Sequence, residues 1–191
     1  MFQPGDLVIY GSTGVCRVEA VEQPGLSGGD GEKMYYRLKP LHQDGLIYTP
    51  AEGGKVAMRA VISRAEAEAL VELIPTIHAQ PWQGGTLQAL AQRYQAVVRT
   101  HDCRELLELI LSIYAKRRQA ESQKRRLGMV DEQYRKQAER LLHGELAVAL
   151  DIPFEDMEAH LAAQFRLEEE PAEETAAEEP IAETPKAGTE E

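Results

Sequence analysis

The chain has 191 residues, of which 43% are hydrophobic, and this size suits one or two small domains. No stretch approaches the ~18 uninterrupted apolar residues of a membrane helix, and residues 1–6 lack the basic and apolar regions of a signal peptide. Cys16 and Cys103 fall in different predicted domains without metal-type spacing. We therefore expect a cytoplasmic protein with neither a disulfide nor a metal site.

The net charge of −11 is concentrated at the C-terminal end of the chain. Residues 168–191 contain ten acidic residues, one basic residue and a single large apolar side chain, Ile181. Such a segment cannot bury enough surface to offset chain entropy, so it is predicted to be a disordered acidic tail. Residues 93–140 have the opposite balance, with 12 basic and 7 acidic residues. The middle of the chain is therefore predicted to present a basic face.

The first 60 residues contain short strand-like segments separated by turns. The segments are rich in β-branched and aromatic side chains and cover residues 6–10, 15–21, 33–38 and 46–50. Residues 24–31 are rich in glycine and predict a flexible loop, whereas Asp44-Gly45 predicts a hairpin turn because this pair tolerates positive φ. Four or five such strands predict a small SH3-like or Tudor-like barrel over residues 1–62.

A change to helical periodicity follows the strands. Ser63 and Glu66 have the spacing of a capping box, and Pro75 ends the helix that they begin. We assign residues 63–85 to this connecting helix and a linker. Apolar side chains recur at helical spacing from residue 86, which predicts an all-α bundle of about four helices over residues 86–167. The predicted fold class is therefore α+β, with two domains and the tail.

Sequence signatures of catalysis are missing. The chain has no Walker-type phosphate loop, no H-E-x-x-H and no C-x-x-C, and its five histidines show no ligand spacing. We therefore predict that the protein is not an enzyme and needs no cofactor.

A dense basic cluster lies in the second predicted domain. Six cations occur within eleven residues, and Glu121 is the only acid among them: Lys116, Arg117, Arg118, Lys124, Arg125 and Arg126. Such a cluster can neutralise several phosphates and release their counterions. Cations near the end of a helix also complement its dipole in solvent, so a structural interpretation stays open. Arg93 is a further candidate contact to nucleic acid.

Trp82, the only tryptophan, lies at the predicted domain boundary between Pro81 and Gly84-Gly85. One interpretation is an aromatic side chain that packs the domains together or packs against the first helix of the bundle. The other is an exposed apolar wedge that enters a minor groove and partly unstacks a base step. Composition alone favours packing.

Together these motifs resemble the CarD-like (CdnL) family of bacterial transcription regulators. The resemblance covers roughly residues 1–165 and rests on the order and spacing of motifs: PGDLVIY at 4–10, YYRLKP at 35–40, LIYTP at 46–50, RAVIS at 59–63, ELILSIYAK at 108–116 and QAERLLHGELAVAL at 137–150. The N-terminal part also resembles the polymerase-binding module of the repair coupling factor Mfd. The helical part and the absence of ATPase motifs favour the CarD-like family.

The resemblance implies a function. A Tudor-like module of this family binds the β subunit of RNA polymerase, here through Leu46, Ile47, Tyr48, Thr49 and Pro50. The helical domain contacts promoter DNA at the upstream edge of the bubble, through its minor groove and backbone and with little sequence preference, and a tryptophan acts as the wedge. This arrangement stabilises the open complex. We expect a monomer with no membrane role, and Trp82 takes the wedge position.

Two departures from the family change this expectation in detail. Gln83, Gly84 and Gly85 follow Trp82 where some relatives have basic residues, which weakens the phosphate contact beside the wedge. Tyr48 stands where some relatives have an arginine, so the polymerase contact is predicted to rest on backbone and aromatic packing along an exposed strand edge. The alternative is a protein–protein adaptor whose helices form a structural bundle without a DNA role.

Overall fold

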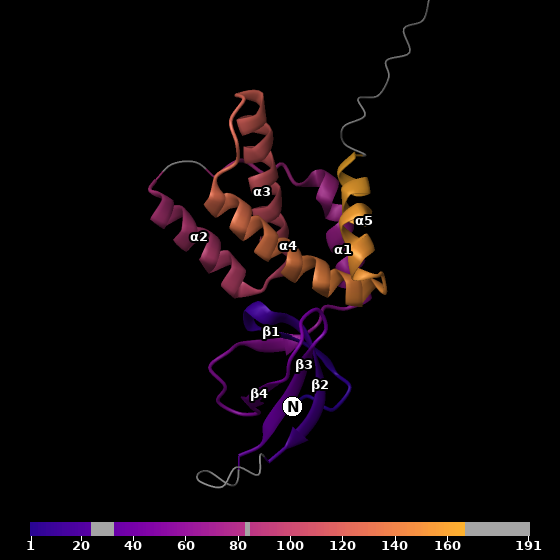
Figure 1. Ribbon diagram of the computed structural model, residues 1–191. Helices are drawn as coiled ribbons and strands as arrows, with labels where there is room; N and C mark the ends of the chain where they lie inside the picture. Colours follow the sequence, from indigo (N-terminus) through magenta and orange to yellow (C-terminus); the bar gives the residue numbers. More distant parts are fainter. Residues whose placement is uncertain (24–32, 83–84, 167–191) are drawn as a thin grey trace, which may run out of the picture.

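The computed structural model describes residues 1–23, 33–82 and 85–166, and it places a β-sheet domain beneath a helical domain (Figure 1). The loop expected at 24–31 and the tail expected at 168–191 lie outside the described residues.

Over residues 1–23 and 33–62, five antiparallel strands form one sheet, in the order β4-β3-β2-β1-β5. Their bounds are β1 Leu7–Tyr10, β2 Gly14–Glu22, β3 Tyr35–Pro40, β4 Ile47–Pro50 and β5 Met58–Ala60. Among the described residues no ladder joins β4 to β5, so these two strands are the edges of the sheet. The α+β class is confirmed, and closure into a barrel stays a prediction.

Alternating apolar side chains give the sheet its own small core. The buried members are Val8, Cys16, Val18, Tyr36 and Leu38. The expected hairpin joins β3 to β4, with Leu38 opposite Ile47 and Gly45 at a φ of 121°. A glycine is favoured at that turn because an L side chain rarely adopts this φ.

In the part of the chain that the structure describes, the helical domain has five α-helices. They are α1 Arg64–Leu73, α2 Leu87–Thr100, α3 Cys103–Ser122, α4 Met129–Leu150 and α5 Phe154–Arg166. The predicted capping box of α1 is present, with Glu66 N–H donating to Ser63 Oγ at 3.3 Å and Ser63 N–H donating to Glu66 Oε2 at 2.7 Å. Within the described part of the chain, none of these helices combines the length and apolar character needed to span a membrane.

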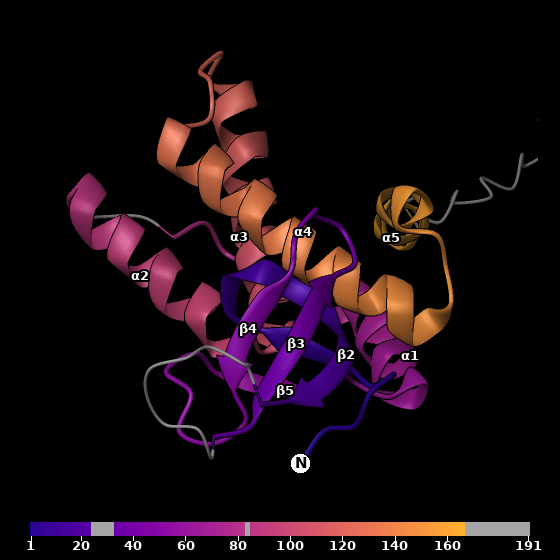
Figure 2. The same ribbon diagram turned by 60° about the horizontal axis from the view of Figure 1, so that its bottom comes forward.

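Helix α1 belongs to the helical core, in addition to connecting the domains. Its buried side chains Ala67, Leu70 and Val71 share one cluster with α3, α4 and α5. Their i, i+3, i+4 spacing puts them on one face, which packs against α4 and α5 (Figures 1 and 2). Residues 86–166 contain four helices, the number predicted for this region, and α1 joins them in the bundle as a fifth.

Helix α4 lies across the sheet and forms most of the domain junction (Figure 2). A Cβ added to Gly144 would come within 3.3 Å of His42, so α4 approaches the sheet domain closely at this point. Next to this contact the His42 ring stacks on Phe154 of α5, with ring centroids 4.3 Å apart.

Candidate polymerase and nucleic-acid interfaces

Strand β4, which contains four of the five candidate polymerase contacts, is an edge of the sheet. Leu46 and Tyr48 are 53% and 51% exposed. Thr49 is buried, and Ile47 packs partly against the sheet core. The five predicted residues therefore lie along one edge of the sheet, but only some of their side chains are exposed to a partner.

The backbone of β4 offers an open hydrogen-bonding edge at Tyr48. Ala51, just after β4, has its N–H pointing toward β3, because this group donates to the Met34 carbonyl at 2.8 Å. Thr49 lies two residues before Ala51, opposite Tyr36, so it also faces β3 with its peptide groups. Because antiparallel ladders alternate, the N–H and C=O of Tyr48 point away from β3. A strand of a partner could pair with this edge.

Trp82 packs against α2 in the helical domain. Its ring stacks on Tyr94 with centroids 5.5 Å apart and an interplanar angle of 26°, and its backbone N–H donates to Ser112 Oγ at 3.2 Å. Arg93 lies over the same ring, with its guanidinium carbon 3.8 Å from the centroid. Trp82 stays partly exposed. The packing that composition favoured is present, and it leaves one part of the indole accessible.

A buried polar network supports Tyr94. The Tyr94 hydroxyl donates to Asp131 Oδ1 at 2.6 Å, and Lys116 Nζ donates to the same oxygen at 2.8 Å. Burial, followed by the bond to Asp131, raises the pKa of Tyr94, so the phenol stays protonated. The charge of Lys116 is therefore compensated inside the protein, and this residue contributes less to a phosphate-binding surface than its place in the basic cluster predicts.

A cleft of 480 Å³ brings Trp82 together with part of the basic cluster. Its lining includes Arg125 and Arg126 from the segment between α3 and α4, and Leu87 and Leu90 from α2. Lys124 has a φ of 55°, and Arg125 N–H donates to the Ala120 carbonyl at 2.8 Å, so a local turn aims the two arginines at the cleft. Leu87 is 72% exposed at its rim.

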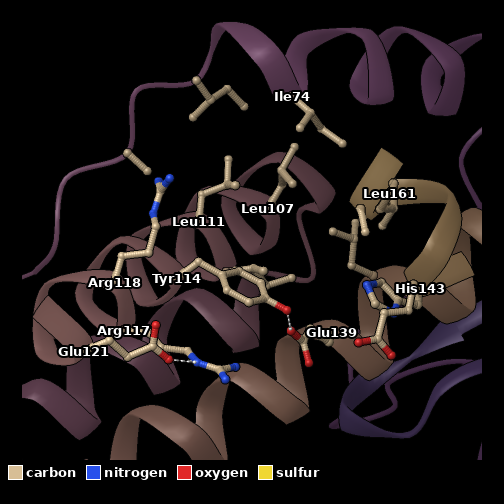
Figure 3. Close-up of a pocket in the computed structure, with 16 residues that line it drawn as sticks. Ile74, Leu107, Leu111, Tyr114, Arg117, Arg118, Glu121, Glu139, His143 and Leu161 are labelled. Carbon is tan, nitrogen blue, oxygen red and sulfur yellow. Dashed lines mark hydrogen bonds and ion pairs between the residues drawn. The ribbon is translucent and has the colours of Figure 1, made fainter. Parts of the chain in front are cut away.

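Arg117 and Arg118 line a different hollow of 520 Å³ between η2 (Ile74–Thr76), α3, α4 and α5 (Figure 3). Its walls are mainly apolar, and Tyr114 donates to Glu139 Oε1 at 2.8 Å beside them. Arg117 also pairs with Glu121 at 2.9 Å. The structure therefore divides the predicted cluster: Arg125 and Arg126 lie beside Trp82, and Arg117 and Arg118 lie on the second hollow.

The sequence did not identify Leu87, Tyr94 and Asp131 as parts of this site. Tyr94 and Leu87 follow the apolar spacing of α2, which predicts core positions for both. Asp131 is a buried acid in the first turn of α4, and only the fold brings it to Tyr94, 37 positions earlier in the chain. Among the described residues no three metal-ligating side chains cluster.

The sheet domain thus has an open edge at β4, and the helical domain has a cleft lined by Trp82, Arg125 and Arg126. Residues 2–62 match the CarD-like/TRCF RID domain family, which comprises RNA polymerase-interacting modules. The N-terminal domain therefore carries a match to this domain family, where the motifs at 4–10, 35–40 and 46–50 predicted a resemblance. The match ends before α1 and includes none of the helical domain. No curated protein matches the chain.

Proposed function

We propose that this protein is a non-catalytic transcription regulator that binds the RNA polymerase β subunit and stabilises the open promoter complex by contacting DNA at the upstream edge of the bubble. The observation that carries the proposal is the presence, in one chain, of a RID domain with an open β4 edge and a Trp82 cleft with Arg125 and Arg126.

The polymerase contact is proposed to form by strand pairing along β4. Leu46 and Tyr48 are exposed there, and the peptide groups of Tyr48 face outward. Main-chain hydrogen bonds in such an arrangement supply affinity, and neighbouring side chains supply specificity. The buried Thr49 would hold β4 flat against β3 without touching the partner.

The DNA contact is proposed to form at the Trp82 cleft. Arg125 and Arg126 are exposed and would face phosphates, while the accessible part of Trp82 meets a base step in the minor groove. Arg93 also lies beside the indole ring and is exposed, so it can reach a phosphate of the same strand. Leu87 adds an apolar contact at the rim of the cleft.

The charge of the whole chain favours a mechanism that depends on polymerase. A protein of net charge −11 is repelled by free DNA at long range. Binding to polymerase would raise the local DNA concentration to the ~mM range, so weak and sequence-tolerant contacts suffice.

The proposal is tested by measuring the dissociation of promoter open complexes with and without the full chain, together with its capture by the isolated β lobe of the polymerase. We expect capture by the lobe and longer-lived open complexes. If the β lobe captures the chain but the open-complex lifetime does not change, the polymerase contact is supported and the DNA role is contradicted.

That second result would favour the adaptor function. The observation that supports an adaptor is the internal use of candidate DNA contacts: Lys116 pairs with Asp131, and Trp82 stacks on Tyr94. Binding to forked promoter DNA in the presence of polymerase separates the two functions, because only the DNA-binding regulator gives salt-sensitive binding.

A further inference from the structure

Among the described residues, one acidic side chain is buried at the junction between the two domains. Glu145 lies in α4 among apolar residues, and its side chain is only 2% exposed. A buried carboxylate is costly unless charged and hydrogen-bonding partners surround it. The partners of Glu145 therefore show what this position holds together.

Each carboxylate oxygen of Glu145 accepts two hydrogen bonds. Arg59 of β5 approaches as a fork, with Nη1 at 2.5 Å from Oε1 and Nη2 at 2.8 Å from Oε2. The Ile62 N–H donates to Oε1 at 3.0 Å, and the Cys103 thiol donates to Oε2 at 3.1 Å. One carboxylate thus joins the edge of the sheet, the segment that enters α1, and the first residue of α3.

Arg59 extends this connection toward the Trp82 cleft. Its Nη2 also donates to the carbonyl of His101, the residue that follows α2. Helix α2 contains Arg93 and Tyr94, which contact the Trp82 ring. The bond to Glu145 raises the pKa of Arg59, so the guanidinium remains charged at this junction.

Two other contacts at the junction constrain orientation less than this fork does. Arg140 Nη2 donates to the Ser12 carbonyl at 3.1 Å on the exposed side, and His42 stacks on Phe154. Stacked rings and apolar contacts tolerate sliding, whereas a two-bond fork from arginine to carboxylate fixes both distance and direction.

We infer that Arg59 and Glu145 are positioning residues that hold the RID sheet and the DNA-facing helices in one relative orientation. The consequence for transcription rests on the proposed function. With polymerase bound at β4 and DNA at the Trp82 cleft, a fixed junction keeps the cleft at the bubble edge. A loosened junction retains both binding surfaces. With β4 bound to polymerase, however, it lowers the effective concentration of the Trp82 cleft at the DNA.

The inference is tested by measuring a distance between the domains in the full chain. Spin labels are placed at Lys55→Cys in the sheet domain and Arg99→Cys in α2, both exposed positions. The native thiols, Cys16 and Cys103, are buried, and burial raises the pKa of Cys16 to about 11, so labelling favours the introduced sites.

Glu145→Gln and Arg59→Lys are the test variants. The first keeps the shape of the side chain and removes its charge, and the second keeps the charge and removes the fork. Glu108→Gln is the matched control, because it breaks the exposed pair with Arg104, which is not at the junction. We expect a broadened distance distribution in both test variants, with unchanged helix content, and a wild-type distribution in the control.

The promoter assay adds a readout that a merely structural role would not move. Binding to the β lobe should stay within twofold of wild type, while the open-complex lifetime falls several-fold. A distance distribution as narrow as wild type in Arg59→Lys overturns the inference, even where Glu145→Gln fails to fold. A broadened distribution with an unchanged lifetime overturns its functional consequence. Failure of the wild type to bind the lobe would instead remove the proposed function and leave the distance result interpretable.

Discussion

The guanidinium carbon of Arg93 lies 3.8 Å from the centroid of the Trp82 ring, and Tyr94, the next residue on α2, stacks on the same ring. A cation over an indole face contributes about 0.5–2 kcal/mol, depending on desolvation. Trp82 is therefore held before any DNA arrives, so a wedge at this position would lose little side-chain entropy on binding.

We predict that Trp82→Ala shortens the open-complex lifetime and retains binding to the β lobe. The substitution removes the proposed wedge on the helical domain, far from the β4 edge. It also removes packing against the helical core, and we expect a loss of stability of about 1–3 kcal/mol, as for other partly buried large side chains. Open-complex decay and thermal unfolding are measured together.

Trp82→Phe is the control for this prediction, because phenylalanine keeps an aromatic face toward Tyr94 and Arg93. We expect it to recover most of the stability and part of the open-complex lifetime. An unchanged lifetime in Trp82→Ala would contradict the wedge and leave Trp82 with a packing role alone.

A charge-matched pair of double variants tests the division of the basic cluster. Arg125→Ala/Arg126→Ala removes two cations from the Trp82 cleft, and Arg117→Ala/Arg118→Ala removes two from the second hollow. With polymerase present, the slope of log K against log salt, which is negative, should become about 1.8 less steep in the first double variant, because each phosphate that a cation neutralises contributes about −0.9 to this slope. The second double variant should change the slope little. Equal slopes in the two variants would contradict the assignment to the cleft.

Local sequence rules predicted the elements of this fold well. The Ser63–Glu66 capping box and the hairpin at Gly45 were confirmed because each depends on residues within a few positions. Arg59 and Glu145 were not predicted, because 86 positions separate them and no local rule pairs them. One signal was present: Glu145 lies four residues after Leu141 and seven after Ala138, on the apolar face of its helix.

The sequence predicted which residue types the site contains better than it predicted how they are arranged. Six cations close in sequence indicated one surface, but successive side chains of a helix project in different directions about its axis. Lys116 therefore reaches the buried Asp131, and Arg117 reaches a different hollow from Arg125. The sequence also singled out Trp82, whereas no local rule predicts that its ring stacks on Tyr94, twelve positions later in α2.

Tyr48→Pro tests strand pairing at β4. Proline lacks an N–H, and the Tyr48 N–H points away from β3, so the sheet should lose no ladder bond. Affinity for the β lobe should fall at least several-fold. Tyr48→Ala, which keeps the N–H and removes the ring, separates backbone from side-chain contributions in the same pull-down. Full binding by Tyr48→Pro would contradict strand addition. Ile47 is a poorer target because it packs against the sheet core.

The protein should lose stability as the pH falls below 6.5. Burial lowers the pKa of His101 and of His143 from 6.5, so between these lowered values and 6.5 the unfolded chain binds more protons. His101 Nδ1 lies 2.7 Å from the Arg99 carbonyl, and its Nε2 is buried without a partner among the described residues. A second proton would therefore leave a buried charged N–H unpaired.

Thermal unfolding midpoints between pH 7.5 and 5 check this prediction. His101→Asn should show a smaller decrease, because asparagine does not titrate and tolerates the left-handed conformation that His101 adopts at the end of α2. A midpoint that stays constant or rises as the pH falls over this interval would contradict the assignment.

Removal of residues 168–191 should increase affinity for free DNA at low salt. This segment has ten acidic residues and one basic residue, and without it the remaining chain has a net charge of −2. Repulsion between the protein and DNA therefore weakens, and a patch such as Arg125-Arg126 gains access to phosphates. A chain with the ten glutamates changed to glutamine keeps the length and should match the deletion. At high salt the three proteins should converge, because screening removes long-range repulsion. Equal affinities at low salt would mean that the acidic segment has no electrostatic influence on DNA binding, and the requirement for polymerase would then rest on the weakness of the cleft contacts alone.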